Sequence, residues 1–243
     1  MKTCKTSIQN VRSSKTDNIK VKRNITEYKL KKLSVESFKN ALRLHFDSIV
    51  LYNNKSYPSA FQLSVLSIEE FGKSEQVEWY YFTLTTNEWT PDVEFEQKFL
   101  NDLYIHPIKQ RVFFNNNDWH EYSPKFIKFI YKRDLEKKKQ KATYVGLERI
   151  RKGNIIDVNS RISIPTSICQ KDAQQMISII RDYLKNVCRL RFFQESYFDI
   201  DEKDDLITKS LLKKIDKWKH RSGLKSKKHL QDWHNIKFNV ANL

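Results

Sequence analysis

The sequence predicts an all-α protein, and three features of composition and pattern lead to that prediction. Only four glycines and five prolines occur in 243 residues, which disfavours a turn-rich doubly wound sheet or barrel. Long segments repeat apolar residues at helical spacing. A chain of this length can bury a sizeable core as one large domain with extensions. We expect a basic arm over residues 1–33, a helical bundle over 34–192 and a C-terminal helical extension over 193–243.

The first two predicted helices form the centre of this bundle. The first begins after Ser34, a favourable N-cap residue, and a turn follows at Asn54. The second begins at Pro58, because proline is favoured in a first helical turn. It stays apolar on nearly every face through residues 79–82 and ends before Asn87. This pattern predicts a long, buried central helix.

Proline positions predict where the next helices begin. Thr90-Pro91 has the pattern of an N-cap followed by a first turn, so a third helix should start there. Pro107 removes a helical donor and disfavours α geometry at the residue before it, which predicts a kink or restart at His106. Ser123-Pro124 repeats the cap-then-proline pattern and predicts a fourth helix of about 22 to 25 residues.

The remaining elements follow from charge and periodicity. The second half of the fourth helix is rich in lysine, so we expect a solvated stretch that returns to the core at Tyr144. Apolar and polar residues alternate loosely over 155–164, which predicts an extended connection. Apolar residues recur at helical spacing over 172–191, which predicts an amphipathic helix. Residues 201–221 predict one last helix, with acids at its start and basic residues toward its end, as the helix dipole favours.

The charge of the chain points to polyanionic partners. Lys and Arg number 45 against 29 acidic residues, a net charge of +16, which favours RNA, DNA or an acidic protein. Residues 1–33 carry ten basic residues against two acids, so this arm could bind RNA, contact a partner subunit or act as a solubilising tail. A DNA-binding regulator ranks last, because no convincing helix-turn-helix is present.

Membrane insertion and a bound cofactor are both disfavoured. No apolar run approaches the roughly 20 residues that span a bilayer, and the first residues lack the apolar stretch of a secretory signal, so we expect a cytoplasmic protein. Cys4, Cys169 and Cys188 lie far apart, which predicts reduced thiols. A zinc set drawn from two of these cysteines with His229 and His234 has gaps too wide to be favoured. We expect no metal and no small-molecule cofactor.

Three clusters could carry chemistry. Glu69, Glu70 and Lys73 lie on the most apolar predicted helix, where Glu69 and Lys73 share a face at i and i+4. One interpretation is an internal ion pair that fixes helix packing, and it has about as much support as a catalytic role. His106 and Lys109 lie about one turn apart at the predicted restart. The third cluster is Lys139, Lys141 and Tyr144, and convergence of all three on one cleft is a hypothesis.

The order of these clusters resembles the AbiV family of abortive infection proteins, whose domain is one of the HEPN helical bundles. The resemblance covers residues 34 to about 190 and rests on an ordered set of short motifs. These are Tyr57-Pro58-Ser59-Ala60, Glu69-Glu70-Phe71-Gly72-Lys73, His106-Pro107-Ile108-Lys109, Lys141-Ala142-Thr143-Tyr144-Val145, and Pro165 followed by the helix from Ala173 to Leu184. It implies a HEPN-like antiparallel helical bundle.

The resemblance also implies a function in phage defence. Such proteins stop translation or phage production in an infected bacterium, as homodimers triggered by a phage-encoded activator protein. Many HEPN proteins are metal-independent endoribonucleases in which four to six residues separate an Arg from a following His. This sequence departs from that pattern, because none of its six histidines has an arginine at that spacing, although lysines do occur there, Lys39 before His45 and Lys213 before His220.

If the protein cleaves RNA, we expect transesterification by the ribose 2′-hydroxyl. His106 is the candidate acid or base, and Lys73 and Lys109 are candidates for stabilising the phosphate. Glu69 would hold Lys73 or His106 in place, Glu70 would bind across the helix packing, and Tyr144 would orient a phosphate or the acid. The candidate RNA-binding residues are Lys137, Lys138, Lys139 and Lys141.

The alternative function is a non-catalytic toxin or sensor that binds the translation machinery or a phage protein. Cleavage that depends on His106 and Lys109 would distinguish the nuclease from salt-sensitive binding that leaves RNA whole. A homodimer is expected for a second reason, because an apolar extension from Val77 to Leu84 would otherwise present a sticky surface. The aromatic residues 79–82 are more typical of a core or a dimer surface than of base stacking.

Overall fold

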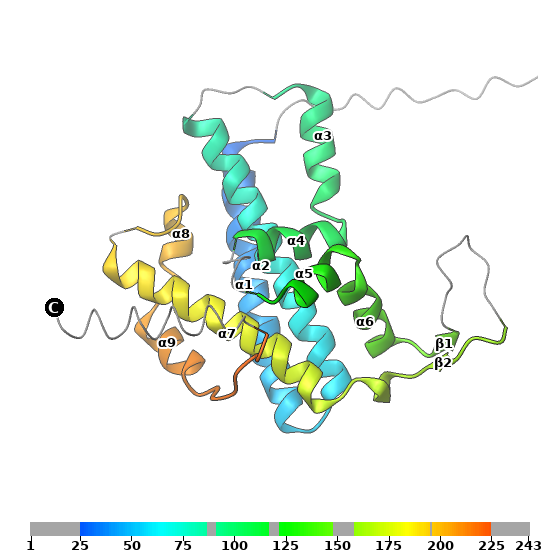
Figure 1. The fold of residues 1–243 in the computed structure, drawn as a ribbon. Helices are drawn as coiled ribbons and strands as arrows, with labels where there is room; N and C mark the ends of the chain where they lie inside the picture. The colour runs from blue at the N-terminus through cyan, green and yellow to red at the C-terminus, as the bar shows by residue number, and fades with distance from the viewer. Residues whose placement is uncertain (1–24, 87–90, 117–121, 148–157, 195, 225–243) are drawn as a thin grey trace, which may run out of the picture.

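The computed structural model describes residues 25–86, 91–116, 122–147, 158–194 and 196–224. These residues form nine α-helices, one short 3-10 helix and a two-stranded ribbon (Figure 1), which confirms the predicted all-α fold. In chain order the elements are α1 (Glu27–Asn53), α2 (Tyr57–Thr86), α3 (Val93–Asp102), α4 (His106–Asn116), α5 (Pro124–Tyr131), α6 (Asp134–Thr143), β1 (Gly146–Leu147), β2 (Ile162–Ser163), η2 (Pro165–Ser167), α7 (Gln170–Phe193), α8 (Asp201–Asp204) and α9 (Lys209–Ile215).

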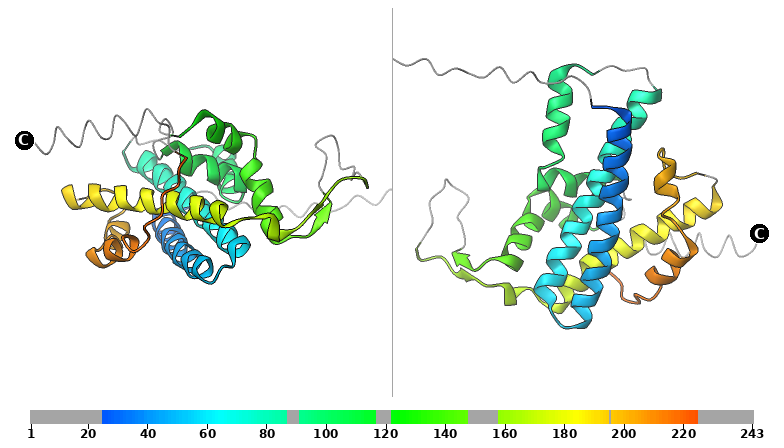
Figure 2. Two further views of the ribbon diagram at one scale, coloured as in Figure 1. Left: turned by 60° about the horizontal axis from the view of Figure 1, so that its bottom comes forward. Right: turned by 180° about the vertical axis from the view of Figure 1, so that it is seen from behind.

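Helices α1 and α2 form a long antiparallel hairpin at the centre of the molecule (Figure 2). Lys55 closes the turn between them with a left-handed φ of 61°. Small side chains allow the two helices to pack closely, and their hydroxyls bond across the interface. Ser74 Oγ donates to the backbone oxygen of Ser34 at 2.8 Å, and Ser67 Oγ donates to that of Ala41 at 2.7 Å. The prediction of a buried central second helix is confirmed.

The predicted start of the first helix after Ser34 is wrong, because α1 begins at Glu27. Thr26 is the N-cap, and its side chain accepts a hydrogen bond from the backbone N–H of Lys29 at 3.4 Å. Leu30 is fully buried, and Ile25 and Leu33 pack against the same small core, so these apolar side chains anchor the additional helical turns in a basic stretch. Residues 27–33 of the predicted arm are therefore helical, while residues 1–24 lie outside the described residues.

Helix α7 crosses the hairpin (Figures 1 and 2), and with α4, α5, α6 and α9 it contributes buried side chains to the main core. Phe71 from α2 meets Phe113 from α4 and Tyr183 from α7, with ring centroids 6.3 and 5.1 Å away. The predicted amphipathic helix over 172–191 is confirmed and extends slightly at both ends. These aromatic contacts fix α4 against α2, which positions the candidate site.

A second, smaller core lies where α3 covers the open end of the hairpin. Tyr80 stacks on Phe99 with centroids 4.0 Å apart, and Val77 is fully buried beside Leu30. Much of the predicted sticky surface from Val77 to Leu84 is thus covered within one chain. Helix α3 begins at Val93, so the cap predicted at Thr90-Pro91 is wrong. Asp92 is the N-cap, and its carboxylate accepts from the backbone N–H of Phe95 at 2.7 Å.

The predicted restart at His106 is confirmed, because α4 begins there. Ser123 caps α5 as predicted, accepting from the backbone N–H of Phe126 at 3.4 Å. The prediction of one long fourth helix is wrong. Arg133 adopts a left-handed conformation with φ of 60°, which ends α5 and lets α6 begin in a new direction at Asp134.

The last elements also differ from the prediction. Tyr144 does not return to the core, since it is 68 % exposed as the chain leaves α6 for β1. β1 pairs antiparallel with β2 through two residues of each strand, so part of the predicted extended connection is confirmed. The single helix predicted over 201–221 is instead α8 and α9 with non-helical chain between and after them. None of the described helices is long and apolar enough to cross a bilayer.

Candidate functional site

A close approach of two helices creates the candidate site. Gly72 on α2 lies directly beneath the backbone of α4, where a Cβ atom would be only 2.1 Å from the carbonyl oxygen of Lys109. Any side chain at this position would therefore separate the two helices. Glu69 lies three residues before Gly72, and His106 lies three residues before Lys109, so the same approach brings Glu69 and His106 together.

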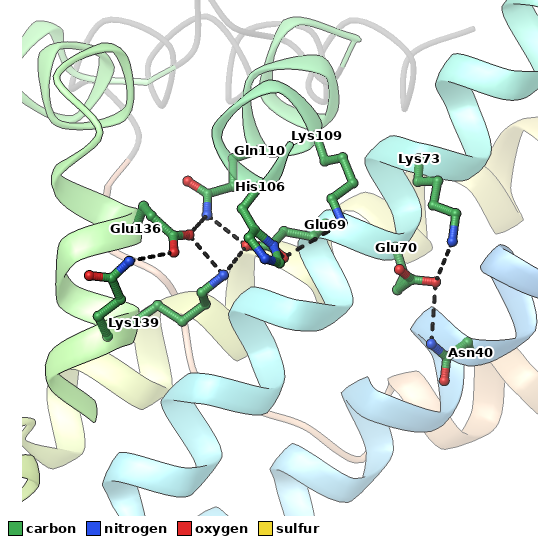
Figure 3. Close-up of polar contacts among 10 residues, drawn as sticks. Asn40, Glu69, Glu70, Lys73, His106, Lys109, Gln110, Glu136 and Lys139 are labelled. Carbon is green, nitrogen blue, oxygen red and sulfur yellow. Dashed lines mark hydrogen bonds and ion pairs between the residues drawn. The ribbon is translucent and has the colours of Figure 1, made fainter. Parts of the chain in front are cut away.

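The carboxylate of Glu69 is the centre of the site (Figure 3). It is 1 % exposed, and its oxygens contact groups from α4 and α6. His106 Nδ1 lies 2.6 Å from Glu69 Oε2, and Gln110 Nε2 donates to Oε1 at 2.8 Å. The ammonium of Lys109 lies 4.0 Å from Oε2. A buried carboxylate requires such partners, because burying it alone costs several kcal/mol.

Helix α6 completes the site with an ion pair. Lys139 Nζ lies 2.7 Å from Glu69 Oε1 and 2.8 Å from Glu136 Oε2, and Gln110 Nε2 also donates to Glu136 at 3.1 Å. The expectation that Lys139 belongs to a solvated, RNA-binding stretch is wrong, since it is buried. Leu135 and Ala142, at one-turn spacing from Lys139, are buried too, so this face of α6 packs against α2.

Glu70 and Lys73 form a separate pair on the other side of α2, as Figure 3 shows. Lys73 Nζ contacts Glu70 Oε2 at 3.5 Å, and Asn40 of α1 donates to the same oxygen at 3.2 Å. Of the two partners predicted for Glu69, His106 contacts it and Lys73 does not, because the carboxylate of Glu69 lies against α4 and α6. The prediction that Glu70 binds across the helix packing is confirmed by its bond to Asn40.

The charges in the site balance when the imidazole is neutral. Glu69 and Glu136 supply two negative charges, and Lys109 and Lys139 supply two positive charges. Burial lowers the pKa of Lys109 from its ordinary value, although the neighbouring Glu69 and Glu70 act in the opposite direction. Within this balanced set His106 differs from the other groups, since 48 % of its side chain is exposed.

Three of these groups present the donor set of a metal site. Ligand atoms of Glu69, His106 and Glu136 all lie within 4.8 Å of one another. The ammonium of Lys139 already bridges the two carboxylates at hydrogen-bonding distance. A divalent cation bound to both carboxylates would have to displace that ammonium and would face Lys109 as well. In this arrangement the lysine supplies the positive charge that a metal would bring.

The other predicted site residues lie apart from this cluster. Tyr144 is exposed beyond the end of α6. Lys137 pairs with Asp134 at 2.7 Å on the exposed face of α6, and Lys138 pairs with Asp172 of α7 at 2.6 Å. Lys141 is partly buried in the last turn of the same helix. Four predicted residues therefore meet, namely Glu69, His106, Lys109 and Lys139.

Sequence reasoning missed Gln110 and Glu136. Gln110 follows His106 at i+4, so both side chains reach Glu69 from one face of α4. Glu136 lies three residues before Lys139, in a run of charged residues that gives no sign of which side chain is directed inward. The available signal was the spacing of Leu135, Lys139 and Ala142, which marks a buried face within the lysine-rich stretch.

Comparison with known protein families identifies a domain in this chain. The family model described as AbiV, a HEPN domain, matches residues 29–185, which is more than half of the chain. This segment runs from the first turn of α1 into α7 and contains every residue of the Glu69 cluster. No curated protein and no solved structure matches the chain.

Proposed function

The chain belongs to the AbiV family of abortive-infection proteins, and we propose that it performs this phage-defence role by cleaving RNA at the Glu69–His106 site. One observation carries the proposal: a buried carboxylate holds one nitrogen of a histidine whose side chain is half exposed. Such a pair is suited to general acid–base catalysis on a substrate that binds at the protein surface.

The buried carboxylate fixes the orientation of the imidazole. Glu69 Oε2 accepts the proton of His106 Nδ1 at 2.6 Å, which leaves Nε2 as the nitrogen that can take a proton from a substrate. Gln110 and Lys139 hold the other oxygen of Glu69, so the carboxylate cannot rotate away. The pair therefore acts as a preorganised general base that needs no nucleophile from the protein.

RNA carries its own nucleophile in the ribose 2′-hydroxyl. In the proposed reaction His106 Nε2 removes the 2′-hydroxyl proton, and the 2′-oxygen forms a bond to phosphorus. The bond from phosphorus to the 5′-oxygen breaks, and that oxygen takes a proton from water at the open face of the site. The products are a 2′,3′-cyclic phosphate end and a free 5′-hydroxyl end.

The surrounding cations support this chemistry electrostatically. Proton uptake by His106 adds one positive charge to an otherwise balanced cluster, which matches the negative charge of a phosphodiester. Lys109, whose ammonium lies 4.0 Å from Glu69 Oε2, would stabilise the developing charge. No metal takes part in the proposed reaction, because Lys139 occupies the position between the two carboxylates.

We further propose the partners that this role implies. RNA would approach over the exposed face of α6, where Lys137 lies, and the net charge of +16 would strengthen its binding at low salt. A second copy of the chain, a phage-encoded activator protein and a cytoplasmic location complete the proposal. The molar mass of the purified protein at micromolar concentration tests the homodimer.

Cleavage of a labelled RNA by the purified full-length protein, with EDTA present, tests the proposed reaction. His106→Ala should lower the rate by about 10²- to 10⁴-fold, the range for losing a general acid or base. Glu69→Gln should lower it by up to about 10⁴-fold, since the amide favours the wrong tautomer of the imidazole. His220→Ala is the matched control, because His220 is exposed and lies on the chain after α9.

A different result would favour the non-catalytic alternative. RNA that stays whole with wild type and with His106→Ala, while salt-sensitive binding persists in both, identifies a toxin or sensor. Cleavage that survives in a folded His106→Ala variant but stops in His220→Ala would move the site to the Lys213 and His220 pair.

A further inference from the structure

Helix α9 and the turn after it carry a row of exposed lysines. Lys209 and Lys213 of α9 and Lys217 just beyond it follow one another at four-residue spacing, and all three are exposed. On the opposite side of the helix, Leu211 and Ile215 are buried in the main core. The apolar face therefore fixes the direction of the three lysines, which we call the lysine row.

The backbone beneath the lysine row is held at both ends. At the start of α9, the side chain of Thr208 accepts a hydrogen bond from the backbone N–H of Leu211 at 3.1 Å. After the helix, Trp218 Nε1 donates to Ser178 Oγ at 2.9 Å, and Arg181 donates to the backbone oxygen of Trp218 at 3.2 Å. Both of these partners lie on α7, so a ligand would meet the lysines on a backbone that is already in place.

Among the described residues, no acid forms an ion pair with the lysine row. Asp216 lies three residues after Lys213, but its carboxylate pairs with Lys185 of α7 at 2.7 Å. That hydrogen bond lowers the pKa of Asp216 from its ordinary value, as do the charges of Lys219 and Arg181, while desolvation acts in the opposite direction. The described part of the chain therefore leaves the charge of the row uncompensated.

The helix dipole accounts for only part of this charge. It favours cations at the C-terminal end of a helix, where Lys213 and Lys214 lie. Lys209 is in the first turn of α9, where a cation is disfavoured, and Lys217 lies beyond the last turn. Residues 206–221 carry six Lys or Arg against one Asp. The arrangement therefore fits an external polyanion better than it fits the stability of the helix.

The surface around the row is polar, which favours a nucleic acid over a protein partner. Protein interfaces depend on a few aromatic and aliphatic anchors that become buried. Among the described residues from 196 to 224, no large apolar side chain is exposed. Nucleic-acid backbones are bound instead by lysines and arginines, which displace counterions from the phosphates. Charge and polarity together thus point to a phosphate backbone.

We propose that the lysine row binds the phosphate backbone of RNA. The choice of RNA over DNA rests on the proposed function, whereas the surface shares no residue with the Glu69 cluster. The row also lies outside residues 29–185, which the AbiV family model matches. Figures 1 and 2 show α9 and α6 on opposite sides of the α1–α2 hairpin. The row would therefore hold RNA at a place apart from the site of cleavage.

The salt dependence of RNA binding measures how many phosphates the row contacts. Fluorescence anisotropy of a labelled single-stranded RNA is measured with the full-length His106→Ala protein, so the result does not depend on whether cleavage occurs. Adding Lys209→Gln, Lys213→Gln and Lys217→Gln together should reduce the slope of log affinity against log salt by about 2, since each lost contact removes about 0.7. The affinity at about 0.1 M salt should fall roughly 10- to 100-fold.

The matched control removes the same charge from another part of the surface. Lys98→Gln, Lys125→Gln and Lys128→Gln change three exposed lysines of α3 and α5, and most of the slope should remain. An equal loss of slope in both triple variants would overturn the proposal, because net charge alone would then explain the binding. So would an unchanged slope without the lysine row, no RNA binding at all, or tighter binding of single-stranded DNA of the same sequence.

Discussion

Replacing Gly72 with alanine should separate α2 from α4 and disrupt the site without replacing any of its residues. The added Cβ would lie 2.1 Å from the carbonyl oxygen of Lys109, against a normal carbon-to-oxygen contact of about 3.3 Å. The backbone of α4 must therefore move by about 1 Å. Because His106 and Gln110 belong to α4, the bond of 2.6 Å from His106 to Glu69 would lengthen to about 3.6 Å and cease to be a hydrogen bond.

Two opposing effects set the change in stability. Alanine favours a helix interior over glycine by about 1 kcal/mol. Overpacking a close helix contact costs about 1–3 kcal/mol, and the carboxylate of Glu69 loses partners as well. We expect the free energy of unfolding to fall by about 1–3 kcal/mol, and RNA cleavage to fall far more than the folded fraction.

Urea denaturation and nitrogen NMR of the His106 ring measure the two consequences. Gly146→Ala is the matched control, since a Cβ there meets nothing within 4 Å. An unchanged Nδ1 proton signal in Gly72→Ala, with stability within about 0.5 kcal/mol of the Gly146→Ala control, would refute the role of the close approach.

Three further predictions concern buried or strained groups. Burial lowers the pKa of His45 from 6.5 to about 3, so only the unfolded chain binds its proton in that window, and stability should fall as the pH drops from 6.5 toward 3. His45→Leu should flatten this dependence in urea denaturation at several pH values; an unchanged slope would contradict it. Lys139→Met leaves the buried carboxylate of Glu69 facing the partly buried carboxylate of Glu136 and should lower the free energy of unfolding by about 3–5 kcal/mol at pH 7; a stability equal to that of wild type would rule this out. Arg133→Gly removes the cost of a side chain in a left-handed conformation, so the free energy of unfolding should rise by about 0.5–1 kcal/mol and the melting temperature should rise with it. A melting temperature below that of wild type would refute this prediction.

The sequence predicted the elements whose start depends on a local rule. Pro107 marked the restart of α4, and Ser123 with Pro124 marked the cap of α5. The break at Arg133 could not be predicted in the same way, because a lysine-rich stretch has high helix propensity and the left-handed residue is not glycine. Packing of Leu135 and Ala142 on α2 fixes that break, and this is a tertiary effect.

The site was predicted as a set of residues, although its pairing was not. Spacing along one helix suggested that Glu69 pairs with Lys73, but the i,i+4 rule describes exposed helices and α2 is covered by α4 and α6. Once α4 packs at Gly72, His106 and Lys139 reach Glu69 from other helices and Lys73 turns to Glu70. Sequence separations of 37 and 70 residues between these partners cannot be read from a local pattern.

Sequencing of cleaved RNA ends in phage-infected cells tests the central claim most directly, because the proposed activator is present there. Cells that express wild type should show new 5′-hydroxyl ends after infection, and cells that express His106→Ala at the same level should lack them. Growth arrest and phage resistance with RNA left whole, or the same ends in both strains, would contradict catalysis by the Glu69–His106 pair.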